Sequence, residues 1–311
     1  MLRPGDDLAR ELVLHGRARD LVTVDNGDAV VAGEAALSAR LAFREGRKVL
    51  DISSEPPDDR LGRLVGVPAA SGFRAAASAA VPERTAQRDL LNLLLDDLPV
   101  ATLVSGYAVG HSGVRLPRVG VHAPQYADLC SGFRTGGTIM LSIERTGFSP
   151  LVTGPPAPPL DDPADPLGWH EMPALPAHGM RRRRRLDVVA GNPLVVDVLF
   201  RDSHMAPDGL ETVIHEYTVT GTLDPKTLEV LSLEAVPRVL PWVECPVAAG
   251  SAERLIGLSV TDLRRRVRTD LTGPSTCTHL NDTLRSLEDV VALCRLLPGP
   301  ARASWSHNSG I

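Results

Sequence analysis

Cysteine is scarce in this chain of 311 residues, which has four, at positions 130, 245, 277 and 294. No two of them form a CxxC pair, and so few thiols over this length do not make a disulfide framework. We therefore expect reduced thiols and a cytoplasmic protein.

Long apolar runs and a strong net charge are also missing. No stretch approaches the roughly 20 apolar residues that a membrane-spanning helix needs, and Met1 to Glu11 lacks the apolar core of a signal peptide. The net charge is −5, and the one basic run, Arg181 to Arg185, leads straight into a strand-like stretch. The sequence thus predicts neither a membrane nor a nucleic acid as a partner.

The common motifs of several enzyme classes are absent as well. The chain has no GxGxxG, no P-loop, no GxSxG and no HExxH. This disfavours dinucleotide-binding proteins, nucleotide hydrolases, α/β-hydrolases and zinc proteases of the HExxH type.

Alternating apolar and β-branched residues are present in two stretches of similar order. In the first, residues 20–24, 35–43 and 48–52 are separated by turn residues and predict an antiparallel meander, followed by helices over 73–80 and 88–98. In the second, strands are predicted over 186–200, 211–222 and 228–239, and helices over 251–257, 260–271 and 278–297.

The two stretches can be aligned with each other. Arg63-Leu64-Val65-Gly66 matches Arg254-Leu255-Ile256-Gly257, and residues 89–92 fall on residues 278–281. We interpret this as an internal duplication, the alternative being a resemblance by composition alone.

The predicted fold class is α+β, with two pseudo-repeated units of antiparallel β-meander followed by helices, joined by a long Pro-rich segment. The N-terminal unit, residues 1–110, is the degenerate copy, and the C-terminal unit, residues 181–311, is the functional copy. Residues 111–180 form the connecting segment, with nine prolines between Pro150 and Pro176. Proline at this density prevents regular structure, and we expect a cover packed on the body rather than a free linker.

A polar helix start, Cys277-Thr278-His279-Leu280-Asn281-Asp282, is where we expect the chemistry to be centred. Unpaired N–H groups at a helix start would stabilise a thiolate at Cys277 and keep His279 neutral. Asp282 lies three residues after His279 on the same helix face, where it can orient the imidazole. The structural alternative is simple capping by a neighbouring threonine with an exposed histidine.

Further candidates lie in the strands and loops before this helix. His215 and Tyr217 share one face of a predicted strand and would serve as a base and a hydrogen-bond donor. Glu244, near Trp242, would be a buried acid with a raised pKa. Each of these groups can equally be structural, as a half-buried aromatic pair or a helix cap.

The resulting assignment gives catalytic roles to six residues and substrate-binding roles to four, with no metal ligands. The catalytic set is His279, Asp282, His215, Tyr217, Glu244 and His204; the binding set is Cys277, Asp202, Asp128 and Trp242.

Several short motifs in the second half, in this order, resemble a bacterial family known only as domain of unknown function 2889. They are Arg182-Arg183-Arg184-Arg185-Leu186-Asp187, Phe200-Arg201-Asp202, Asp208-Gly209, Glu244-Cys245-Pro246, Leu255-Ile256-Gly257 and Cys277-Thr278-His279-Leu280. The resemblance covers about residues 181–293. The family pattern has a glycine before the last motif, where this chain has Thr276. The resemblance implies no catalytic role.

The residues favour a cofactor-independent acid/base enzyme acting on a small organic molecule, with lyase, hydratase or isomerase chemistry. One alternative is a metal-dependent hydrolase, in which zinc or iron is held by histidine, cysteine and carboxylate ligands. Another is a small-molecule-binding protein without enzyme activity. The expected partner is a small-molecule substrate, and a homodimer is a further possibility.

Overall fold

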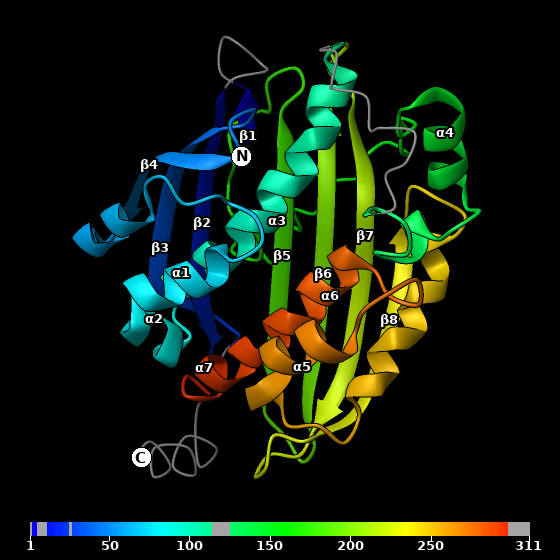
Figure 1. Ribbon diagram of the computed structural model, residues 1–311. Coiled ribbons are helices and arrows are strands. Elements are labelled where there is room, and N and C mark those ends of the chain that lie inside the picture. The colour runs from blue at the N-terminus through cyan, green and yellow to red at the C-terminus, as the bar shows by residue number, and fades with distance from the viewer. Residues whose placement is uncertain (1, 5–10, 25–26, 114–124, 298–311) are drawn as a thin grey trace.

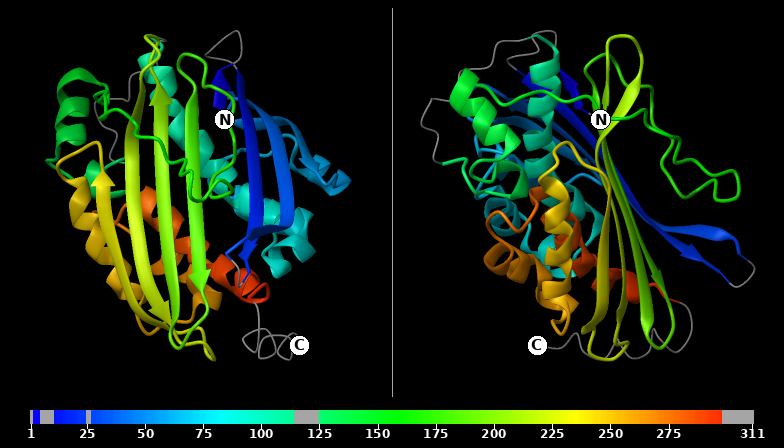
Figure 2. Two further views of the ribbon diagram at one scale, coloured as in Figure 1. Left: turned by 180° about the vertical axis from the view of Figure 1, so that it is seen from behind. Right: turned by 90° about the vertical axis from the view of Figure 1, so that its right-hand side faces the viewer.

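Two β-meanders join edge to edge into one antiparallel sheet of eight strands, in the order β4-β3-β2-β1-β5-β6-β7-β8. The helices cover one face of this sheet (Figures 1 and 2). The computed structural model describes residues 2–4, 11–24, 27–113 and 125–297. The predicted turn residue Asn26 lies outside these ranges.

The first meander consists of β1 (Leu2–Pro4), β2 (Glu11–Thr23), β3 (Ala29–Ala42) and β4 (Lys48–Glu55), and the second of β5 (Met180–Val189), β6 (Leu194–Met205), β7 (Glu211–Leu223) and β8 (Val230–Val239). After β4 follow η1 (Asp59–Leu64), α1 (Phe73–Ala80), α2 (Pro82–Gln87) and α3 (Leu90–His111). After β8 follow η3 (Cys245–Leu255), η4 (Val260–Asp262), α5 (Leu263–Asp270), α6 (Thr278–Ser286), η5 (Leu287–Asp289) and α7 (Val290–Cys294).

The α+β class and both meanders agree with the sequence prediction, whereas two helices differ from it. Helix α3 continues to His111, beyond the predicted end at residue 98, although Pro99 removes a helical hydrogen bond within it. The buried face that α3 presents to β2 and β3 outweighs this local loss. The connecting segment was expected to be irregular, but it contains η2 (Ser131–Phe133) and α4 (Thr138–Thr146).

By length and composition, α3 is the one helix among the described residues that would suffice to cross a membrane. The sequence reading, which found no such apolar stretch, is corrected on this point. Of the apolar 18-residue stretch of α3, 56% is buried inside the protein. Leu91, Leu94, Leu95 and Leu98 belong to the core.

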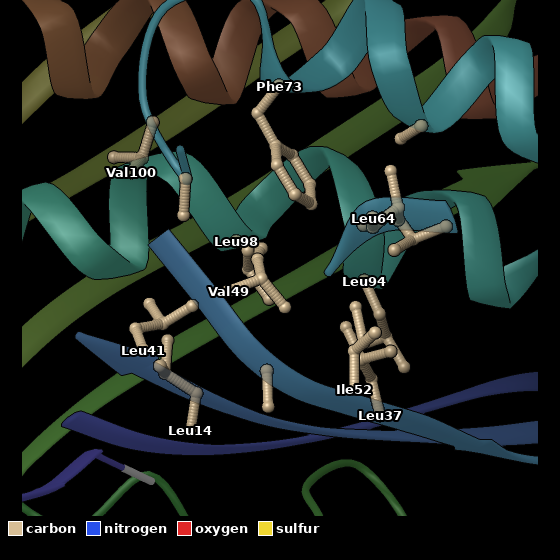
Figure 3. Close-up of a cluster of buried hydrophobic side chains, with 14 of the residues drawn as sticks. Leu14, Leu37, Leu41, Val49, Ile52, Leu64, Phe73, Leu94, Leu98 and Val100 are labelled. Atoms are coloured by element: carbon tan, nitrogen blue, oxygen red, sulfur yellow. The ribbon is translucent and has the colours of Figure 1, made fainter. Parts of the chain in front are cut away.

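Each meander has its own apolar core. The first core lies between β2–β4 and helices α1 and α3, and includes Leu41, Leu64 and Phe73, each at most 1% exposed (Figure 3). The second lies between β6–β8 and the C-terminal helices, and is a separate cluster. The first core also reaches into the second half, because Met180 of β5 and Ile214 of β7 belong to it.

Buried and half-buried ion pairs add to the contact between the halves. The four shortest pairs that join a side chain of the first unit to one of the second are Arg74–Asp282 at 2.7 Å, Asp96–Arg285 at 2.8 Å, Asp97–Arg184 at 3.1 Å and Arg88–Glu288 at 3.0 Å. We call these four pairs the ionic joint. It lies where α3 contacts both α6 and β5.

The two units share an unusual local connection. In the first, the Val49 N–H donates to Val67, and the Gly66 N–H donates back to Val49. In the second, Val230 and Leu258 form the same bond, and the Gly257 N–H donates to Val230. Positive φ angles also coincide, at 84° for Gly66 and 83° for Gly257.

The proline-rich stretch runs along the sheet face away from the helices (Figure 2). The N–H of Ala157 donates to the carbonyl oxygen of Glu211, the first residue of β7, and Arg201 donates to the Pro158 carbonyl oxygen. Further along, Arg19 donates to the Trp169 carbonyl oxygen at 2.8 Å. This stretch therefore packs on the body, but on the outer face of the sheet.

Truncating Phe73 tests the first core. Its ring is fully buried, so Phe73→Ala should lower the free energy of unfolding by about 3–5 kcal/mol. Urea unfolding measures this loss. Leu50→Ala, on the outer face of β4 at 41% exposure, is the matched control and should cost much less; equal losses would contradict the core described here.

Candidate functional site

Three elements of the second unit bring a carboxylate and two histidines together. The register of β6 and β7 places Asp202 opposite His215, and the first turn of α6 adds His279. The sheet positions follow from alternation: Phe200 and Asp202 share the inner face of β6, which the helices cover. We call Asp202, His215 and His279 the Asp-His-His cluster.

The two imidazoles are stacked. Their ring centroids lie 3.6 Å apart with an interplanar angle of 21°. The Nδ1 atoms of His215 and His279 lie 3.4 and 3.6 Å from the same Asp202 oxygen, Oδ2. Both distances exceed that of a good hydrogen bond, and both Nδ1 atoms are buried without another partner. Since 12% of the His215 side chain and 16% of the His279 side chain are exposed, other ring atoms remain within reach of a small molecule.

Asp202 is a fixed anion, although it is only 1% exposed. Arg182 donates from Nε to Oδ1 at 2.9 Å and from Nη2 to Oδ2 at 3.1 Å, a bidentate pair. Burial by itself would raise the pKa of this carboxyl, but the charge of Arg182 outweighs it and holds the pKa well below its usual range. The cluster therefore keeps one negative charge at neutral pH.

The pKa of His279 is lowered well below the ordinary value, first by burial and then by the neighbouring His215, while Asp202 acts in the opposite direction. A neutral His279 was expected from its place at a helix start; burial is the larger cause. Two imidazolium cations stacked at this distance would repel each other.

Asp282 does not orient His279, contrary to expectation. Its Oδ1 accepts a hydrogen bond from Arg74 and its Oδ2 one from Arg182, both at 2.7 Å. The helix turns this side chain toward β5 and α1, where two arginines occupy both oxygens. The carboxylate that lies next to the histidines is instead that of Asp202, which was expected to bind substrate.

Tyr217 and Cys277 lie deeper than the Asp-His-His cluster. Tyr217 is fully buried, Cys277 is 4% exposed, and the phenol faces the thiol. Burial is the first cause that raises the pKa of each group. The expected thiolate at Cys277 is therefore wrong, because desolvation outweighs the N–H groups of the helix start.

Glu244 and Trp242 belong to another part of the molecule. The Glu244 carboxylate accepts hydrogen bonds from the N–H and the hydroxyl of Thr138, at 2.7 and 2.9 Å, and so caps α4. Partial burial acts to raise its pKa, but the bonds from Thr138 lower it. The expected raised pKa is wrong. Trp242 packs on the small cluster of Ile139, Met140 and Ile143.

His204 lies among other aromatic rings. Its centroid is 5.1 Å from that of His111, 5.2 Å from that of Tyr107 and 5.8 Å from that of His178. Burial, followed by the two histidines, lowers its pKa to about 4. Asp128 is bound to the backbone and hydroxyl of Thr135 in an exposed loop, so neither residue joins the Asp-His-His cluster.

The Asp-His-His cluster has the donor types of a metal site. One ligand-type atom from each residue lies within 4.8 Å of the others. Two imidazoles bound to one zinc ion at about 2.0 Å in tetrahedral geometry would, however, hold their ring centroids about 5 Å apart. The stacked pair is closer than that, so metal binding requires one ring to turn, whereas proton transfer does not.

Arg182 is the important residue that the sequence assignment left out. The basic run alternates along β5, so Arg182 and Arg184 face the helices and pair with acids. That alternation was the available signal. The acids that Arg182 would bind, Asp202 and Asp282, could not be identified without the fold.

Removing Arg182 should destabilise the protein in a pH-dependent way. Arg182→Met leaves Asp202 buried without a cation. This should lower the free energy of unfolding at pH 7 by about 3–5 kcal/mol. In the wild-type chain the lowered pKa of Asp202 contributes stability that is lost only as pH falls through that low pKa. In the variant the pKa of Asp202 rises, so protonation at pH 5 should relieve part of the loss.

Urea unfolding at pH 7 and pH 5 measures this difference. The control is the double variant Arg182→Met/Asp202→Asn, which has no carboxylate at position 202. It should lose less free energy of unfolding, and this loss should change less with pH. A loss of equal size at both pH values in the single variant would show that Asp202 does not depend on Arg182.

Comparison with known proteins gives one match. The searches of curated proteins and of solved structures found no significant match. The Asp-His-His cluster and Arg182 both fall within the matching region. Residues 180–293 match the family model described as "Protein of unknown function (DUF2889)", the family that the sequence motifs indicate.

Proposed function

We propose that the protein is a cofactor-independent acid/base enzyme that acts on a small organic molecule, with a lyase, hydratase or isomerase reaction. The observation that carries the proposal is the stacked pair of His215 and His279 over the ionised Asp202. A buried carboxylate held by a bidentate arginine is a fixed charge that can support one imidazolium.

The proposed chemistry uses the two rings in opposite roles. The neutral imidazole takes a proton from the substrate, and the protonated one gives a proton to the leaving group or to a second carbon. The pair holds one proton before and after this exchange, so no external acid or base is consumed. Asp202 stabilises whichever ring is cationic, and Arg182 keeps Asp202 in place.

Several properties of the protein as a whole are part of the proposal. We infer that the units are copies of one ancestral meander-and-helices unit, supported by the equivalent bonds at Val49 and Val230 and the matching positive φ angles. On this view residues 111–180 are an inserted connection. A cytoplasmic location is consistent with the free cysteines, and a homodimer remains a proposal.

A metal-dependent hydrolase is the second candidate, because the ligand-type atoms of Asp202, His215 and His279 approach each other within 4.8 Å. Zinc or iron would be held by Asp202 Oδ2 and by the two Nδ1 atoms, which have no hydrogen-bond partner. Arg182 would then be the outer group that holds the ligating carboxylate.

An exchange assay tests the acid/base proposal without a known substrate. Protein in deuterated buffer is mixed with a panel of small hydroxy acids, enoates and ketones, and incorporation of deuterium is followed by NMR. His279→Gln and His215→Gln should each lower the rate on any compound that exchanges by at least about 100-fold. His170→Gln, on the opposite face of the sheet, is the histidine control.

The variants should keep their thermal stability, since the rings make no strong hydrogen bond. If the wild-type chain catalyses exchange and both glutamine variants catalyse it at the same rate, the assignment of the two histidines is contradicted.

Elemental analysis separates the two candidates. We expect purified protein, before and after dialysis against zinc, to hold no stoichiometric metal, and chelators to leave its activity unchanged. One equivalent of zinc or iron that disappears in Asp202→Asn and in His215→Gln would instead favour the hydrolase.

A further inference from the structure

A large hollow lies away from the Asp-His-His cluster, between the two half-sheets. Strand β1 has three residues and pairs with β5 only at Leu2 and Met180. Beyond this point, β2 and β5 run side by side without pairing among the described residues. A cavity of about 920 Å³ opens between them, and none of Asp202, His215 and His279 is among its described lining residues.

One wall of this cavity is aliphatic. Helix α3 contributes Leu90, Leu93 and Leu94, and Leu293 of α7 is joined by Leu296 just beyond it. A wall of this kind binds the apolar body of a ligand rather than a hydrated ion.

Carboxylates from three elements face one another in the same cavity. Asp20 comes from the inner face of β2, Asp89 from the start of α3 and Asp289 from the end of η5. Asp20 forms no hydrogen bond and no ion pair with any described residue. Asp289 is 5% exposed, and its Oδ1 binds Arg264 at 2.7 Å, but its Oδ2 is buried without a partner.

The arginines around the cavity either have acceptors of their own or lie on the outer face of the sheet. Arg184 pairs with Asp97 at 3.1 Å, and Arg88 pairs with Glu288 at 3.0 Å. Arg19 donates to the carbonyl oxygens of Leu167 and Trp169 on the outer face of the sheet. Arg17 and Arg183 also lie on that outer face by strand alternation. No described cation therefore neutralises Asp20.

The electrostatics agree with this geometry. The pKa of Asp20 is raised to about 6, first by burial and then by the charges of Asp289 and Asp89. Burial also raises the pKa of Asp289, against the effect of Arg264 and Arg184. A cation placed between Asp20 and Asp289 would remove this repulsion.

We propose that the cavity between β2 and β5 binds an organic amine, with its ammonium group between Asp20 and Asp289 and its apolar body on the leucines of α3 and α7. The site is separate from the Asp-His-His cluster and does not depend on the function proposed for it.

Three probes of equal chain length test the head group: hexylamine, hexan-1-ol and hexanoate, titrated into the full chain by calorimetry and by the fluorescence of Trp169, which lines the cavity. We expect hexylamine to bind at least about tenfold more tightly than hexanol, a difference of about 1.4 kcal/mol, and hexanoate not to bind. Equal affinities for the amine and the alcohol, or tighter binding of hexanoate, would overturn the proposal.

The pH dependence gives a second test. Protonation of Asp20, with a pKa of about 6, removes the charge that the ammonium needs, so hexylamine should bind about tenfold more weakly at pH 5 than at pH 7. Hexanol should bind equally at both values. An amine affinity that does not fall on acidification contradicts the role of Asp20.

Asp20→Asn should lower the affinity for hexylamine to that for hexanol and leave hexanol binding unchanged. Because Asp20 has no partner to lose, this variant should fold. Its thermal unfolding temperature at pH 7.5 should be higher than that of the wild type. Asp51→Asn, an exposed carboxylate of β4, is the control and should bind the amine like the wild type. An Asp20→Asn protein that retains amine selectivity would refute the site.

Discussion

The ionic joint is the interaction on which the rest of this structure depends. Met180 and Ile214 of the second meander join the apolar core of the first. The boundary between the units is also crossed by arginine–carboxylate pairs, among them Arg74–Asp282 and Arg184–Asp97. Buried pairs add little net stability compared with apolar contacts, but breaking one is costly. The joint therefore fixes how the halves are oriented more than how strongly they adhere.

Arg182 connects this joint to the Asp-His-His cluster. One side chain binds Asp282 of the joint and, bidentately, Asp202 below the histidines. The same contact explains why Asp282 is turned away from His279 and why Asp202 stays ionised while buried. Asp282 is itself held by Arg74 of the first unit, so Arg182 links the cluster to both units.

The two units differ most at their first strands, β1 and β5. Strand β5 pairs with β6 along ten residues, whereas β1 pairs with β2 along three. The short β1 leaves two strand edges apart and opens the cavity that Asp20 faces. Leu90 and Leu93 of α3 line this cavity. One unit thus carries the paired histidines, and the other supplies an apolar wall.

The sequence by itself determined both meanders, the α+β class and the family motifs, because alternation and helical spacing are local properties of the chain. It misjudged the end of α3 at Pro99, the pKa values of Glu244 and Cys277, and the partner of His279. Those depend on burial and on which charges lie nearby. Only the tertiary structure decided that Asp202 rather than Asp282 faces the histidines, because β-sheet register and the position of Arg182 set that distance across 77 residues of chain.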